Sequence, residues 1–339
     1  MDVIFMGTDE IACGFLGALL SAGGVSVRAI VTQPDRRSGR RLKVTPGPVR
    51  AMSLERSLPI EVLTPPKVNA PEVFEDLAAR KPDLIIVVAY GQILGRRILE
   101  LPRLGCVNFH LSLLPLLRGA APITRSILEG FSETGVTAMR MDAGMDTGDV
   151  IGTRRTPITD DDTYGTLSAR LTEMGRYLML EILPKLANGT ATFTPQDNSA
   201  ATYAPKLQKD EWLIDWSLPA VEVCRTVRAF NPKPACTTFL PPDSSDISCC
   251  NHPGSLLKII EARVEDETRA NVAPATILSL NGGPLIAAGD GRCVRLTEVR
   301  PEGRPRSISG VDFVNGYRQR VREGDRLFPG LTTALQSCG

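Results

Sequence analysis

The chain has 339 residues, of which 42% are hydrophobic and 23% charged, and its formal net charge is +1. This length predicts two domains with a sizeable core, and the balanced charge excludes a protein that is basic over its whole surface, so any nucleic-acid-binding surface must be local. No apolar run approaches the roughly 20 residues that a membrane-spanning helix needs, and the sequence begins without the pattern of a secretory signal, so we expect a cytoplasmic protein.

The first part of the chain alternates short apolar runs with amphipathic stretches, which predicts a doubly wound α/β fold with a mainly parallel sheet. The predicted strands are Val3–Met6, Val27–Thr32, Glu61–Leu63, Leu84–Ala89, Cys106–Leu111 and Val136–Met141. The predicted helices are Ile11–Ala22, Val49–Arg56, Pro71–Arg80, Ala121–Glu129 and Tyr164–Leu186. The last helix is followed by Asn188 and Gly189, a common C-terminal stop, so we place the first domain at residues 1–189.

The turn after the first strand argues against a dinucleotide-binding enzyme. The dinucleotide fingerprint needs a second glycine at position 9, where this chain has Asp9. No phosphate-binding P-loop occurs in the sequence either. We therefore expect an ordinary strand-to-helix turn, capped by Thr8 or Asp9.

A basic loop follows the second strand. Residues 33–46 contain five cations and a single acid, which is dense for a chain of net charge +1. A solvated surface loop is the plain alternative, but this loop leaves the same edge of the sheet as the candidate site below. A phosphate-bearing partner would explain it. The cations are Arg36, Arg37, Arg40, Arg41 and Lys43.

The most informative segment is Gly105–Pro115. Residues two apart in a strand share a face, so Asn108 and His110 lie side by side, near the strand end where ligands bind in open α/β sheets. An amide that can stabilise an oxyanion, beside an acid/base group, is suited to acyl-type transfer. The sequence holds only two histidines, so His252 is the single other candidate.

An acidic loop, residues 141–149, places three carboxylates among two glycines directly after a predicted strand. A parallel strand would bring this loop to the same side of the sheet as His110, where a carboxylate favours the charged imidazole. We choose Asp146 because it lies deeper in the turn, although the spacing does not exclude Asp142. A polar turn without a catalytic role is the alternative.

Residues 190–210 are polar and loosely patterned, and we interpret them as a linker. Residues 211–339 then form a second domain, in which a helix over Pro219–Ala229 precedes short β-like runs typical of a small barrel. These runs are Leu256–Ile260, Ala275–Leu280, Leu285–Ala288 and Val294–Val299. A second basic cluster fits the same phosphate-bearing partner; it comprises Arg292, Arg295, Arg300, Arg304 and Arg306.

The eight cysteines are scattered without a CxxC pair, as expected of free thiols in a reducing compartment. Cys249, Cys250 and His252 lie together in residues 241–253, which have the composition of an exposed insertion. No partner motif for a metal site accompanies them. We therefore expect no metal.

In combination, these motifs resemble the folate-dependent formyltransferases. The resemblance rests on Asn108 and His110 followed by Ser112–Pro115, on Arg118–Pro122 and on Asp146–Gly148. Further motifs in the same order extend it over nearly the whole chain; they are Ala89–Gly91, Met141–Asp142, Thr32–Arg36, Pro46–Val49, Tyr203–Leu207, Ile214–Trp216 and Arg228–Pro232.

The resemblance implies 10-formyltetrahydrofolate as the formyl donor and, as acceptor, the α-amino group of methionine esterified to initiator tRNA. It implies that Asn108 stabilises the developing oxyanion, that His110 moves protons, and that Asp146 orients and charges the imidazole or takes the amine proton through water. The implied folate-binding residues are Ala89, Tyr90, Gly91, Ile93, Ser112, Leu113, Leu114, Pro115 and Asp142. The basic loop would contact the tRNA acceptor stem, an OB-like second domain would also bind the tRNA, and the protein would be a monomer.

The sequence departs from the family pattern near both substrates. Leu116 and Leu117 stand where the family commonly has a basic and an aromatic residue, Arg41 replaces a glycine, and Lys233 stands where tryptophan is frequent. Three alternatives stay open: formyl transfer to glycinamide ribonucleotide, transfer to an amino sugar nucleotide, and a catalytically silent tRNA-binding protein. The first usually lacks a second domain. The second would bring a fused dehydrogenase-like partner or lack this basic loop and barrel together, whereas the intact Asn/His/Asp set disfavours the third.

Overall fold

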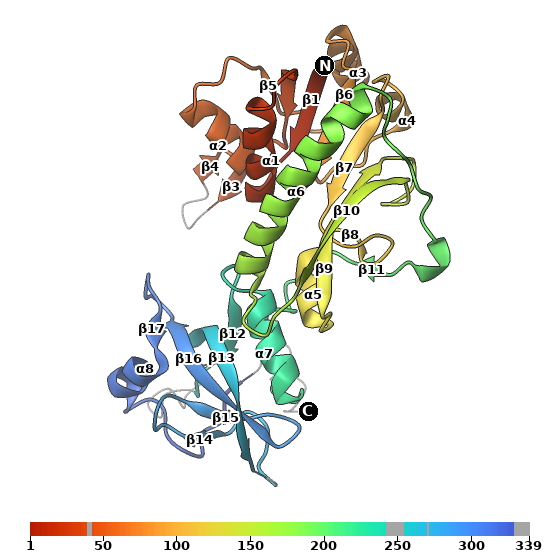
Figure 1. Cartoon of the computed structure of the whole chain (residues 1–339). Helices are drawn as coiled ribbons and strands as arrows, with labels where there is room; N and C mark the ends of the chain where they lie inside the picture. The colour runs from red at the N-terminus through yellow and green to blue at the C-terminus, as the bar shows by residue number, and fades with distance from the viewer. Residues whose placement is uncertain (39–42, 242–253, 270, 329–339) are drawn as a thin grey trace. The chain divides into compact units, whose positions relative to one another are not determined.

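Seven strands form one mixed sheet in the N-terminal part of the protein, with the order β10-β9-β7-β6-β1-β2-β5 (Figure 1). The strands are β1 (Asp2–Gly7), β2 (Ser26–Val31), β5 (Val62–Leu63), β6 (Leu84–Val88), β7 (Cys106–His110), β9 (Glu133–Arg140) and β10 (Val150–Pro157). The five strands from β5 to β7 are mutually parallel, and β9 and β10 add an antiparallel edge. This arrangement confirms the predicted fold class. The computed structural model describes residues 1–38, 43–241, 254–269 and 271–328.

Helices cover both faces of this sheet. On one face, α3 and α4 pack on a core that includes Ile4, Met6 and Ile85. On the other face, α1 and α6 cross the sheet (Figure 1), and Phe15 of α1 packs on Phe109 of β7 with ring centroids 5.2 Å apart. The helices of this part are α1 (Glu10–Leu20), α2 (Pro48–Glu55), α3 (Pro71–Ala79), α4 (Arg96–Leu99), α5 (Pro122–Leu128) and α6 (Tyr164–Ala187).

The strand that precedes the acidic loop runs opposite to the expected direction. β9 pairs antiparallel with β7, so that Thr137 lies opposite His110 and Arg140 opposite Val107. The carboxyl end of β9 therefore lies beside the amino end of β7, and the expectation of a parallel strand is wrong. The residues of β9 carry no signal of its direction, because the alternation of side chains along a strand reads the same either way. The loop that follows leads directly into β10, which is antiparallel to β9.

Contacts divide the chain into two compact units. The first comprises Met1–Ile123, Ser132–Ile158 and Leu167–Lys206, and the second comprises Thr124–Phe131, Thr159–Thr166 and the chain from Leu207 on. The second unit contains an antiparallel sheet of order β12-β13-β16-β15-β14, with β17 paired to β16. Its elements are α7 (Ala220–Ala229), β12 (Cys236–Phe239), β13 (Leu256–Thr268), β14 (Ile277–Ser279), β15 (Leu285–Ala287), β16 (Arg292–Pro301), β17 (Ile308–Ser309) and α8 (Gly310–Tyr317). The predicted strand-rich C-terminal part is thus confirmed.

Polar contacts explain why two short stretches belong to the second unit. Arg125 forms a two-pronged ion pair with Glu211, with N–O distances of 2.5 and 2.9 Å. Burial by itself would raise the pKa of Glu211, but the hydrogen bonds from Arg125 and from the Gln208 N–H together lower it. Arg228 likewise donates to the main-chain oxygens of Thr159 and Asp162, at 3.2 and 3.0 Å.

Three small elements complete the described chain: the hairpin of β3 (Arg36–Ser38) and β4 (Lys43–Thr45), the pair of β8 (Arg118–Gly119) and β11 (Tyr203–Ala204), and the short helix η1 (Asn198–Ala200). None of the described helices combines the length and the apolar character that crossing a bilayer requires.

We predict that Gly175→Ala destabilises the first unit. A Cβ at position 175 would lie 2.2 Å from Cζ of Phe15, which is fully buried against β7, and overpacking of this kind costs about 1–3 kcal/mol. Gly17→Ala is the matched control, because its Cβ would meet nothing closer than 3.7 Å and alanine favours a helix by about 0.5–1 kcal/mol. Urea unfolding of both variants measures the difference. Equal stabilities would contradict this account of the packing.

Candidate active site

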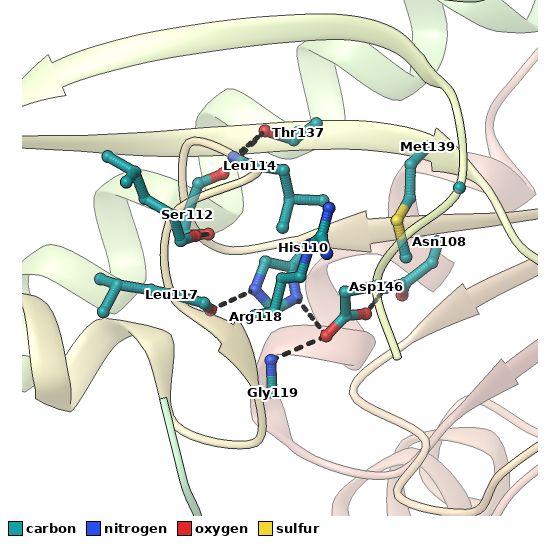
Figure 2. Close-up of polar contacts among 12 residues, drawn as sticks. Asn108, His110, Ser112, Leu114, Leu117, Arg118, Gly119, Thr137, Met139 and Asp146 are labelled. Atoms are coloured by element: carbon teal, nitrogen blue, oxygen red, sulfur yellow. Dashed lines mark hydrogen bonds and ion pairs between the residues drawn. The ribbon is translucent and has the colours of Figure 1, made fainter. Parts of the chain in front are cut away.

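Asp146 lies between Asn108 and His110, the two polar residues that share a face of β7 (Figure 2). Its Oδ2 is 3.6 Å from Nδ1 of His110 and accepts a hydrogen bond of 2.8 Å from the N–H of Gly119. Its Oδ1 accepts a longer contact of 3.4 Å from Nδ2 of Asn108. The structure thus brings together the three residues that the sequence proposes as catalytic.

A main-chain oxygen fixes the roles of the two nitrogens of His110. The imidazole is only 6% exposed, and its Nε2 lies 2.9 Å from the carbonyl oxygen of Leu117. Because a carbonyl oxygen only accepts hydrogen bonds, Nε2 carries a proton in this arrangement. Nδ1, which faces Asp146, is therefore the nitrogen at which His110 can take up and release a proton.

The acidic loop reaches His110 by folding back along β7. Asp146 has a φ of +54°, and Gly148 passes so close to β9 that a Cβ there would lie 1.7 Å from the carbonyl oxygen of Arg140. Asp142 instead accepts hydrogen bonds from the Gly144 N–H (3.0 Å) and the Thr147 hydroxyl (2.6 Å). Of the two carboxylates that the sequence left open, Asp146 faces the imidazole, whereas Asp142 is exposed and closes the loop.

The segment after β7 is held in a tight turn. The hydroxyl of Ser112 donates to the oxygen of Leu116 at 2.6 Å, and Leu114 is followed by a cis peptide bond to Pro115. Thr137 of β9 donates to the oxygen of Ser112 at 2.8 Å and accepts from the Leu114 N–H at 3.1 Å (Figure 2). These contacts present the Leu117 carbonyl to His110.

The turn after β6 lies where the parallel strands end. Its main chain adopts positive φ at Ala89 and Gly91, and the oxygen of Tyr90 accepts hydrogen bonds from Thr8 and Gln33, both at 2.9 Å. The Tyr90 side chain belongs to the core, and burial raises its pKa to about 12. Tyr90 can therefore offer only its main chain to a ligand, whereas the side chain of Ile93 is 82% exposed.

The basic loop is described only in part. Arg36 and Lys43 lie at the ends of the β3–β4 hairpin, and Arg40 and Arg41 fall outside the described residues. An ion pair of 2.6 Å between Asp35 and Arg50 anchors the start of this loop.

The second basic cluster is not uniformly available to a partner. Arg295 is occupied by Glu265 and by the main-chain oxygens of Asn281 and Gly283. Arg304 lies over the ring of Tyr317, 6.0 Å from its centroid. Cys249, Cys250 and His252 lie outside the described residues, and the described residues contain no cluster of three potential metal ligands.

Two further residues hold the site, Gln196 and Thr202, and the sequence gives no sign of their role. Both lie in residues 190–210, where the polar and loosely patterned sequence predicts only a linker. Gln196 donates to the main-chain oxygens of Asp146 (2.9 Å) and Gly148 (2.7 Å), and Thr202 accepts from the Leu117 N–H (2.8 Å). No local pattern in the sequence indicates these contacts.

Comparisons with known proteins find related sequences over nearly the whole chain. Residues 2–183 match the family profile described as formyl transferase, and residues 206–318 match the formyl transferase C-terminal domain. The chain is 44% identical to the methionyl-tRNA formyltransferase of Pseudomonas syringae pv. tomato over 328 residues, which cover 96% of this chain and 98% of that protein. It is also 44% identical to the protein of the same name from Pseudomonas fluorescens, with 96% and 97% covered.

Solved structures share the fold at lower identity. One is an N-formyltransferase from Helicobacter canadensis in complex with folinic acid and dTDP-3-aminofucose, with a TM-score of 0.59, 19% identity, and 87% of this chain and 98% of that chain covered. Another is HypX from Aquifex aeolicus in complex with tetrahydrofolic acid, with a TM-score of 0.59, 18% identity, and 95% and 48% covered.

We predict that Gly148→Ala loosens the acidic loop. The added Cβ would collide with the main chain of β9, so the hydrogen bonds of the Arg140 N–H to Asp149 and of the Gly119 N–H to Asp146 should open more often. Hydrogen–deuterium exchange of peptides covering residues 116–122 and 138–150 should then become about ten-fold faster or more. The control, Gly23→Ala, adds a Cβ with nothing within 4 Å. Unchanged exchange in the Gly148 variant would refute the close approach.

Proposed function

The chain belongs to the formyl transferase family, and from this premise we propose that it transfers the formyl group of 10-formyltetrahydrofolate to the α-amino group of methionyl-initiator tRNA. The observation that carries the proposal is the position of Asp146, between Asn108 and His110, in a chain 44% identical over 96% of its length to a methionyl-tRNA formyltransferase. The product, N-formylmethionyl-tRNA, serves translation initiation.

In this proposal Asn108 provides the oxyanion stabilisation. Its contact with Asp146 is long, at 3.4 Å, so its Nδ2 is weakly engaged and available to the formyl oxygen as the amine adds to the formyl carbon. A preorganised donor of this kind contributes on the order of 3–4 kcal/mol to the transition state. The amide carries no charge, so no ion pair needs to be broken when the oxyanion forms.

His110 and Asp146 manage the protons. His110 keeps Nε2 on the Leu117 oxygen and works through Nδ1, 3.6 Å from the carboxylate. The pair takes up the proton that leaves the amine when the new C–N bond forms, and returns a proton to the folate nitrogen when the old C–N bond breaks. Asp146 stabilises the imidazolium between these two events.

The formyl donor supplies the reacting carbon when it is bound. The residues around the turn after β6 fit a folate: the main chain of Ala89, Tyr90 and Gly91 lies at the ends of the parallel strands, and Ile93 offers an exposed apolar side chain. Ser112–Pro115 would line the other side, with Asp142 at the acidic loop. No metal takes part in the proposal.

In this proposal, positively charged side chains bind the phosphates of the tRNA. We assign the catalytic domain to residues 1–189 and a tRNA-binding domain to residues 211–339. Residues 190–210 connect the two domains, and the first compact unit includes them as far as Lys206. The basic loop, with Arg36, Arg37, Arg40, Arg41 and Lys43, contacts the acceptor stem. The protein acts as a cytoplasmic monomer.

A formylation assay with several candidate amines identifies the acceptor. Purified protein with 10-formyltetrahydrofolate should formylate methionyl-initiator tRNA, and should leave free methionine, glycinamide ribonucleotide and an amino sugar nucleotide unmodified in the same assay. Transfer to a small amine alone would retain the chemistry and overturn the substrate. Binding of the tRNA without transfer to any acceptor would indicate a silent tRNA-binding protein.

Asn108→Ala and His110→Ala should each lower kcat by about 10²–10³-fold, because each removes a group that acts in the transition state. Steady-state kinetics at saturating folate and tRNA measure the loss. His252→Ala, which alters the other histidine of the chain, should retain full activity. Turnover of the His110 variant near that of the unsubstituted protein would overturn the proposed proton transfer.

Replacement of the five basic-loop cations by glutamine should raise the KM for tRNA and flatten its dependence on salt. The slope of log KM against log salt should fall by about 0.7–0.9 for each tRNA phosphate that the loop no longer neutralises. The kcat at saturating tRNA should change little. The control replaces Arg96 and Arg97, whose side chains are 85% and 62% exposed, by glutamine. An unchanged salt slope in the loop variant would contradict the role of this loop.

A further inference from the structure

Residues 196–204, which we call the return segment, come back from α6 to lie against the candidate active site. β11 pairs in parallel with β8, so that Tyr203 lies beside Arg118 and Ala204 beside Gly119 (Figure 1). The pairing is tight, because a Cβ on Gly119 would lie 2.7 Å from the oxygen of Ala204. The return segment is therefore fixed to the residues that contact His110 and Asp146.

The main-chain groups of residues 117–120 form hydrogen bonds alternately with the catalytic pair, His110 and Asp146, and with the return segment. The Leu117 oxygen binds His110, and the N–H of the same peptide unit, on Arg118, donates to the Thr202 oxygen at 2.9 Å. The Gly119 N–H binds Asp146, and the next N–H, on Ala120, donates to the Ala204 oxygen at 2.9 Å. The Thr202 hydroxyl also accepts from the Leu117 N–H at 2.8 Å. Each peptide group that holds a catalytic side chain thus has the return segment directly beside it.

Gln196 joins the return segment to the acidic loop. Its Oε1 accepts from Nε and Nη2 of Arg118, at 3.2 and 2.7 Å, which leaves Nε2 to donate to the oxygens of Asp146 and Gly148. Arg118 is 2% exposed and also donates to Asn198 at 2.8 Å. A buried guanidinium requires acceptors, so the orientation of the Gln196 amide is fixed, and with it the position of the loop that carries Asp146.

We propose that Gln196 and Thr202 are positioning residues for formyl transfer: Thr202 fixes His110 through the Leu117 and Arg118 peptide groups, and Gln196 fixes Asp146 through its main chain. Neither residue contacts the reacting atoms. This inference rests on the proposed function for its kinetic consequence, whereas its structural content concerns the positions of His110 and Asp146 and does not depend on the reaction. The segment that the sequence presents as a linker is then part of the construction of the active site.

The kinetic test uses Thr202→Val, which keeps the side-chain shape and removes the acceptor, and Gln196→Glu, which keeps an acceptor for Arg118 and removes the donor to the acidic loop. Each should lower kcat about 10- to 100-fold, as expected for a displaced catalytic group, with little change in the KM for folate or tRNA. Thr192→Val, at an exposed position just before the return segment, is the control and should behave as the unsubstituted protein. A fall in melting temperature without a fall in kcat would overturn the proposal.

Double variants show whether the effect passes through the catalytic pair. Thr202→Val should cost nothing further in a His110→Ala background, and Gln196→Glu nothing further in an Asp146→Asn background, because residues that act as a unit are not additive. Additive losses would mean that the two residues act on general stability instead.

A spectroscopic test does not depend on activity. The chain has two histidines, so ¹⁵N-histidine labelling gives two imidazole rings, and His252→Gln identifies the signals of His110. In the unsubstituted protein the neutral ring should carry its proton on Nε2, and Thr202→Val should shift both nitrogen signals, whereas Thr192→Val should not. Unchanged His110 signals in Thr202→Val would refute the positioning role. Shifted signals in a protein that formylates no acceptor would uphold it and refute only the proposed function.

Discussion

The hydrogen bond from His110 Nε2 to the Leu117 oxygen is the contact on which the rest of the site depends. Nε2 of the ring is bound to the main chain by this contact, and Nδ1 faces Asp146. For this to happen, the segment after β7 must turn back on itself, which it does through Ser112, the cis peptide before Pro115 and the positive φ of Leu117. The Leu117 side chain is 1% exposed, so the departure from the family pattern at this position is absorbed in the core rather than presented to a substrate.

The loop that carries the Asp146 carboxylate begins at the opposite end of β7 from His110. Because β9 is antiparallel to β7, the acidic loop begins at the far end of β7 and must double back to bring Asp146 to His110. Gly148 allows this by its close approach to Arg140, and Asp142 closes the loop on itself. Two carboxylates in one short loop therefore have different tasks, one in building the loop and one in facing the imidazole.

The features that could be predicted from the sequence are those encoded by the alternation of polar and apolar residues along a strand. Asn108 and His110 could be paired because residues two apart in a strand share a face. The apolar run of Leu84–Val88 is likewise typical of a strand buried on both faces, and β6 lies at the centre of the sheet. The direction of β9 could not be predicted, since a strand's pattern is the same read either way, and exposed Arg154 and Arg155 concealed β10. Gln196 and Thr202 contact partners 50 and 85 residues away, and such pairings leave no periodic trace in the sequence.

The second unit is assembled from three separate stretches of chain, and this limits how the protein could exchange parts with its relatives. A recombination event within residues 190–210 looks harmless in the sequence, yet it would take Arg125 from one parent and Glu211 from the other. A chimera joined within this segment therefore keeps this ion pair only if its two parents carry matching residues at positions 125 and 211.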